Sequence, residues 1–293
     1  MTHALDTDAA PSAPRMLRHG LAIAAAGLTG FGLILWIAAH WDTLGCTGQF
    51  ALLQTGVVAA CALAWRGGVV RPAAGLLALL GIGGLFAFFG QTYQTGADAW
   101  QLFALWAALG VPLALGVRSD VVWAPWTLVA MVAVALWVQA HTGHRWRVEP
   151  SDLWVHLIGW GAALGVCGVS VPVMRARLGT GVWAFRGGVT LAVVMVGATA
   201  LGGLFPTQVQ PQFGAGLLTL AVAAGLLYRP GLFDVFALSA VALGLDTLLV
   251  AGLARLLFSG GGGDAIGVLL LIGLFAAGLL ALSVSLLLKR ARA

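Results

Sequence analysis

The sequence has very few charged residues. Asp, Glu, Lys and Arg together make up 9% of its 293 residues, whereas 60% are hydrophobic. A soluble domain usually carries about 25% charged residues, so a soluble fold of this size would leave much of its apolar surface in water. The composition excludes an ordinary soluble domain and indicates that lipid is the main solvent of the chain.

Cysteine is also scarce, and the three cysteines form no motif. Cys61 and Cys167 fall within apolar stretches and Cys46 stands alone in a short connection, which argues against a disulfide framework and a thiolate metal site. The sequence has no phosphate-binding loop, HExxH motif, G-x-S-x-G elbow or kinase signature. We therefore expect no cofactor and assign no catalytic residue, and we leave a bound metal open.

Against these absences stand ten long apolar stretches. A helix needs about 20 mostly apolar residues to cross a bilayer, and strands are excluded because the stretches lack the alternation of a membrane barrel. The expected fold class is all-α, a polytopic transmembrane bundle of about ten helices. The eighth stretch is short, so it either crosses with little tilt or re-enters. The expected spans are 20–40, 49–65, 72–90, 99–117, 121–140, 153–174, 187–205, 213–228, 231–254 and 265–288.

Positive charge is concentrated in every second connection between these stretches. Cytoplasmic loops of membrane proteins carry an excess of Lys and Arg, so both termini are expected in the cytoplasm. Arginine outnumbers lysine fourteen to one beside 42 glycines, which suggests a GC-rich bacterial genome, so the expected location is a bacterial inner membrane. The net charge of +5 then reflects contact with the lipid bilayer and not with nucleic acid. The opposite connections hold only Arg145, Arg147 and Arg255. The first set comprises Arg15, Arg18, Arg66, Arg71, Arg118, Arg175, Arg177, Arg186, Arg229, Lys289, Arg290 and Arg292.

The chain is expected to consist of two membrane halves between short tails. Residues 1–18 form a disordered cytoplasmic tail, residues 19–145 the first half, residues 146–288 the second half and residues 289–293 a basic cytoplasmic tail. A signal peptide is the alternative interpretation of the first stretch, but its apolar run is long and no A-x-A cleavage site follows.

Similar segments four helices apart suggest an internal repeat. Trp-Ile-Ala-Ala-His at 36–40 matches Trp-Val-Gln-Ala-His at 137–141, and the third and seventh stretches both end in Gln/Thr-rich segments. An offset of four helices preserves direction, so the repeat would be parallel rather than inverted. Chance similarity is the alternative, because Ala, Leu, Val and Gly dominate the composition.

Asp246 is the outstanding ionisable residue. It lies near the middle of the ninth stretch, where a carboxylate is costly and therefore suggests a proton or cation site. The alternative is a neutral Asp held by a hydrogen bond from Ser, Thr or the backbone. Asp234, near the inner end of the same stretch, is interpreted as an interfacial or turn residue.

Polar side chains also gather at the expected outer face. Asp152 and His156 are four residues apart on one helix, so the carboxylate can orient the imidazole. The group can form a pocket or a metal site, or simply a polar layer facing water. Its members are His40, Asp42, Gln91, Tyr93, Gln94, Asp98, His141, His144, Asp152 and His156.

Residues 89–98, Phe-Gly-Gln-Thr-Tyr-Gln-Thr-Gly-Ala-Asp, are followed by Trp100, Leu102, Phe103, Trp106 and Pro112. This pattern, with Ala-Ala-His-Trp-Asp at 38–42, resembles the bacterial membrane proteins of domain of unknown function 2157, over roughly residues 16–145. That family more often has Asn where this chain has His40, which argues against a shared metal site there. The resemblance implies no reaction, but it adds Trp100 to the expected outward-facing polar pocket.

Three classes of function stay open. The first is a transporter or channel for a small solute, with Asp246 coupling transport to a proton or cation. The second is a scaffold, sensor or envelope-assembly component that binds a periplasmic or membrane protein partner. The third is a membrane enzyme acting on envelope substrates, with Asp42, Asp98 or His141 as acid–base groups.

Overall fold

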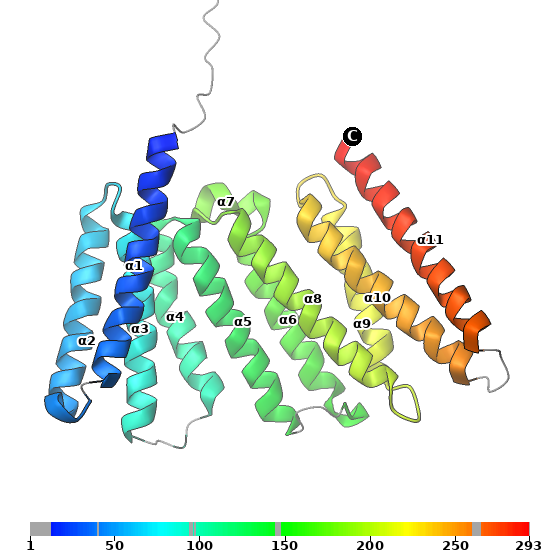
Figure 1. Cartoon of the computed structure of the whole chain (residues 1–293), viewed down its shortest axis with the longest axis horizontal. Helices are drawn as coiled ribbons and strands as arrows, with labels where there is room; N and C mark the ends of the chain where they lie inside the picture. Colours follow the sequence, from blue (N-terminus) through cyan, green and yellow to red (C-terminus); the bar gives the residue numbers. More distant parts are fainter. Residues whose placement is uncertain are drawn as a thin grey trace, which may run out of the picture. The chain divides into compact units, whose positions relative to one another are not determined.

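The computed structural model describes residues 13–39, 41–93, 96, 98–143, 148–259 and 265–292. Over these ranges the chain forms eleven α-helices, one 3-10 turn and no strand, which confirms the all-helical prediction (Figure 1). The helices are α1 (Ala13–Ala39), α2 (Trp41–Arg66), α3 (Arg71–Tyr93), α4 (Ala99–Val117), α5 (Asp120–Thr142), α6 (Leu153–Val169), α7 (Pro172–Leu178), α8 (Val182–Leu204), α9 (Pro211–Leu227), α10 (Val235–Ser259) and α11 (Ala265–Arg292).

Every apolar stretch expected from the sequence is helical. Eight helices are long and apolar enough to cross a membrane, and two shorter apolar helical segments are Gly20–Trp36 and Pro211–Leu227. The second of these is the short eighth stretch. A multi-pass membrane protein is therefore supported, whereas the cytoplasmic termini and the internal repeat stay predictions.

The sixth helix is shorter than its expected span of 153–174. It ends at Val169, and a separate helix, α7, begins at Pro172. Proline disfavours helical backbone in the residue before it, and Val171 accordingly has extended backbone with φ −59° and ψ 151°. The helix is interrupted there, and the basic residues Arg175 and Arg177 lie in the separate short helix α7.

The helices group into two compact units, one comprising Met1–Thr95 with Leu109–Val122 and the other Gly96–Ala108 with Trp123–Ala293. In the first unit, α3 packs against both α1 and α2. Glycines of α3 permit this close approach: a Cβ on Gly81 would lie 2.7 Å from Val57 Cγ2, and Gly84 lies against Ile34 and Leu53. Small residues serve this purpose in membrane helices, where packing rather than water drives association.

The second unit is organised around α8. This helix packs against α6, α9 and α10, while α10 also packs against α9 and α11 (Figure 1). The buried face of α8 presents Phe185, Val189 and Val196 to a common apolar core, in which Trp160 of α6 and Leu220 of α9 also lie. Because α8 contacts α6, α9 and α10, it determines how these three helices are placed relative to one another.

One glycine sets the separation of α8 and α9. A Cβ on Gly216 would lie 2.6 Å from Ala200 Cβ, and that neighbour has no flexible end that can move aside. Gly214 on the same helix has open space around its Cα. A substitution at either glycine changes the helix propensity of α9, but only one at Gly216 also affects the contact with α8. Comparison of the two separates these effects.

We expect Gly216→Val to destabilise the detergent-purified protein by about 1–3 kcal/mol, the usual cost of overpacking a closely packed site. Gly214→Val, which places the same side chain in open space, is the matched control and should change stability much less. Thermal unfolding of both variants measures the difference. Equal shifts for the two would contradict the close α8–α9 contact.

Candidate functional site

Asp246 lies close to the middle of α10. It is eleven residues past the first residue of that helix, so its Cα is about 16 Å along the axis from the start. The Ser283 hydroxyl of α11 donates a hydrogen bond to Asp246 Oδ1 at 3.1 Å. The other carboxylate oxygen, Oδ2, is buried without a hydrogen-bond partner. One of the two carboxylate oxygens of Asp246, near the middle of α10, therefore has a hydrogen-bond partner and the other has none.

A cavity of about 340 Å³ adjoins Asp246 between α9, α10 and α11. Its lining contains no Lys, Arg or His, and apart from Asp246 the polar side chains are those of Tyr228 and Ser283. The remaining lining residues are apolar: Ala224, Gly225, Leu238, Ala242, Leu245, Leu249, Leu286 and Leu287. A proton or a small cation is the partner that this arrangement of oxygens can bind.

Arg290 holds one end of α11 beside this cavity. Its Nε donates to the Tyr228 carbonyl at 3.0 Å, and its guanidinium lies over the rings of Tyr228 and Phe233, 5.4 and 5.0 Å from their centroids. These contacts connect the end of α11 to the turn between α9 and α10. They fix the helix that supplies Ser283.

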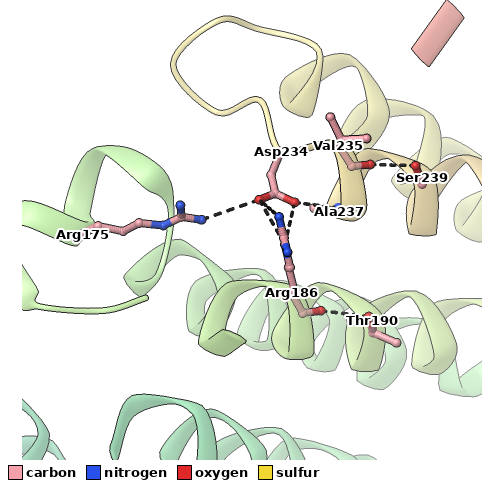
Figure 2. Close-up of polar contacts among 7 residues, drawn as sticks. All are labelled: Arg175, Arg186, Thr190, Asp234, Val235, Ala237 and Ser239. Atoms are coloured by element: carbon pink, nitrogen blue, oxygen red, sulfur yellow. Dashed lines mark hydrogen bonds and ion pairs between the residues drawn. The ribbon is translucent and has the colours of Figure 1, made fainter. Parts of the chain in front are cut away.

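A second acidic residue, Asp234, lies directly before α10 and is buried at 8% exposure. It accepts a hydrogen bond from the Ala237 backbone N–H at 3.0 Å, which caps the helix. Arg186 of α8 donates to both carboxylate oxygens, from Nε at 3.2 and 3.3 Å and from Nη2 at 3.3 Å (Figure 2). Asp234 thus connects the start of α10 to the second turn of α8.

A second guanidinium reaches the same carboxylate from α7. Arg175 Nη2 lies 3.9 Å from Asp234 Oδ2 (Figure 2), and the Arg175 guanidinium lies 5.7 Å from the centre of the Phe185 ring. Two cations share one carboxylate, so the cluster of Arg175, Arg186 and Asp234 carries an excess positive charge.

The sequence pointed to Asp234 only as an interfacial or turn residue. The helix-capping role was readable, because an Asp immediately before an apolar run is a common start signal. The pairing with Arg186 was not readable, since 48 residues separate the two and no local pattern links them.

The outer-face residues divide between the two units and the undescribed positions. His40, Gln94 and His144 lie outside the described residues, and of Asp42 only the helical backbone is described. Gln91 and Tyr93 end α3 in the first unit, where the Tyr93 ring packs 5.0 Å from Phe89 and 6.0 Å from Phe50, centroid to centroid.

The remaining outer-face residues belong to the second unit. The rings of Trp100 and His141 lie 6.1 Å apart, and His141 Nδ1 is 2.8 Å from the Trp137 carbonyl. Asp152 accepts a hydrogen bond from Ser151 at 3.2 Å, whereas His156 is buried with its ring 6.3 Å from that of Trp160. Asp98 is exposed. The common pocket of all these residues stays a prediction.

No set of three His, Cys, Asp or Glu side chains in the described ranges lies close enough to hold a metal ion. The pairs seen at this face, Trp100 with His141 and His156 with Trp160, are ring contacts.

Comparison with known proteins agrees with the membrane architecture. Residues 3–123 match a family model described as "Predicted membrane protein (DUF2157)". This confirms the family resemblance. The match spans the first three helices and α4, less than half of the chain, and its description names no activity. No curated protein and no solved structure matches the chain.

We expect Asp234→Asn to lower the stability of the protein by about 2 kcal/mol. That value lies between those of an exposed and a buried ion pair, because Arg186 is about one-third exposed. The amide oxygen of Asn can still accept the Ala237 N–H, so Asp234→Ala should cost about 1 kcal/mol more through loss of the cap. Thermal unfolding of both variants tests this order, and an Asn variant as stable as wild type would show that the ion pair contributes nothing.

Proposed function

We propose that the chain is a bacterial inner-membrane protein that transports a small solute or ion, with both termini in the cytoplasm. The observation that carries this proposal is Asp246. A carboxylate inside a membrane normally pairs with a cation or lines a functional path, and among the described residues no cation pairs with this one. A transported or coupling proton or cation satisfies the oxygen that Ser283 leaves free.

The cavity geometry supports the same function. Asp246 and Ser283 come from two helices, α10 and α11, so a change in the separation of these helices changes access to the carboxylate. The outer-face residues remain our candidates for the solute entrance. The twelve-to-three division of basic residues supports the orientation.

We expect Asp246→Asn to abolish ion-driven flux while leaving the protein folded, because Asn keeps the shape and the bond to Ser283 but cannot carry the charge. The measurement is uptake into proteoliposomes of protons, Na⁺ and K⁺, read with ion-sensitive dyes, followed by a panel of small solutes under each gradient. Ser283→Ala should reduce the rate without abolishing it.

The matched control for this experiment is Thr247→Val. Thr247 adjoins Asp246 on α10, but it is exposed and donates to the Leu243 carbonyl of its own helix. Its variant should transport at the wild-type rate. Flux that persists in Asp246→Asn excludes the coupling role, and a wild-type protein that moves none of the ions or solutes overturns the transport proposal.

A second candidate function, a scaffold or assembly component, is favoured by α11. This helix of 28 residues has no buried residue, and its apolar side chains include Leu270 and Leu274 at 70% and 74% exposure. Within the described part of the chain it packs mainly against α10. A helix so exposed has most of its surface available to a helix of another protein as well as to lipid.

A photoreactive amino acid at Leu274 tests this second function in intact cells. We expect a discrete cross-linked protein band from that position if α11 is an association surface. The same amino acid at Leu218 of α9, which is 66% exposed, is the control and should give no protein band. Identical patterns at both positions would exclude a specific partner on α11.

A further inference from the structure

An apolar groove runs along α8 between α6 and α9. Its buried floor includes Trp160, Phe185 and Leu220, at 2%, 1% and 2% exposure, whereas Leu164 of α6 and Leu226 of α9 at its edges are 48% and 41% exposed. The groove has a volume of about 220 Å³. Because its edges are exposed, it opens on the outside of the unit.

The length of the groove matches one leaflet of a bilayer. Its lining on α8 runs from Phe185 to Val196, which is eleven residues further along the chain and thus about 16 Å along the helix axis. The hydrocarbon core of a bilayer is about 30 Å thick, so one leaflet is roughly 15 Å. The groove, which begins near the start of α8, is therefore about as long as one leaflet is thick.

A cationic group stands at the surface end of the groove. Val171 and Phe185 line it, and the Arg175 guanidinium lies 5.7 Å from the centre of the same Phe185 ring. Arg175 is 25% exposed, and the carboxylate nearest to it, Asp234, is already bound by three contacts to Arg186. The positive charge of Arg175 is thus only partly balanced.

We propose that this groove binds an anionic phospholipid, with one acyl chain along α8 and the phosphate on Arg175. The apolar lining suits a hydrocarbon chain, and basic pockets at helix ends bind anionic lipid headgroups. A free phosphate would use Arg175 but not the groove, and a zwitterionic lipid would leave the charge unbalanced. The site is independent of Asp246, because its lining shares no residue with the Asp246 cavity.

Two substitutions test the two ends of the site separately. Arg175→Gln removes the charge, and Arg177→Gln in the same short helix is its control. Gly168→Leu fills the groove, since Gly168 lines it and has open space for a side chain. Gly165→Leu, on the same helix with equal space but outside the lining, is the matched control.

The measurement is retention of phosphatidylglycerol, and of phosphatidylcholine with the same acyl chains, by native mass spectrometry of the detergent-purified protein. Thermal unfolding with each lipid, and with inorganic phosphate, gives a second readout. We expect wild type and both controls to retain phosphatidylglycerol selectively. Arg175→Gln should weaken retention by about tenfold or more, the usual effect of losing a hydrogen bond to a charged group. Gly168→Leu should also weaken retention, because its side chain occupies the space of the acyl chain.

The outcomes separate the alternatives. Equal retention of the two lipids by wild type overturns recognition of the headgroup. If Gly168→Leu retains phosphatidylglycerol as well as wild type does, the acyl chain does not lie in the groove. This test does not depend on whether Arg175→Gln folds. A thermal shift with inorganic phosphate as large as with phosphatidylglycerol assigns Arg175 to a free anion and overturns the lipid site.

Discussion

Polar groups inside a membrane need partners within the protein, because hydrocarbon offers no hydrogen bonds. The last carbonyls of a helix have no partner within it, and here arginines from other helices supply one. Arg71 Nη2 donates to the Gly116 carbonyl of α4 at 2.6 Å. Arg255 of α10 donates to the carbonyls of Leu204, Pro206 and Thr207 at the end of α8.

The same constraint distinguishes Asp234, directly before α10, from Asp246 in the middle of that helix. Asp234 has a complete set of partners, two guanidiniums and a backbone N–H, so the fold accounts for its presence. Asp246 has one hydroxyl and no described cation, at a depth where a charge is most costly. The described contacts of Asp234 therefore account for its charge, whereas those of Asp246 leave one carboxylate oxygen without a partner.

The sequence predicted the helices, which depend on composition and on the length of the apolar stretches. It did not predict the contacts between side chains of distant helices. The ten apolar stretches became helices because lipid leaves few alternatives, and only the ends moved, as at Pro172. The middle position of Asp246 followed from the same count. Its bond to Ser283 and the joining of Asp234 to Arg186 depend on how distant helices pack, and no local pattern encodes that. The outer-face pocket depends likewise on packing between distant segments, and it stays a prediction.

The short helix α9 links the two cavities of the second unit. Its 17 residues extend about 25 Å, which is less than a hydrocarbon core of about 30 Å. Leu220 and Ala223 face the apolar groove, whereas Ala224 and Tyr228 face the Asp246 cavity. One wall therefore separates them. Arg290 of α11 donates to the Tyr228 carbonyl at the end of this wall, so α11 is connected to the side of α9 that faces Asp246 and not to the side that faces the groove.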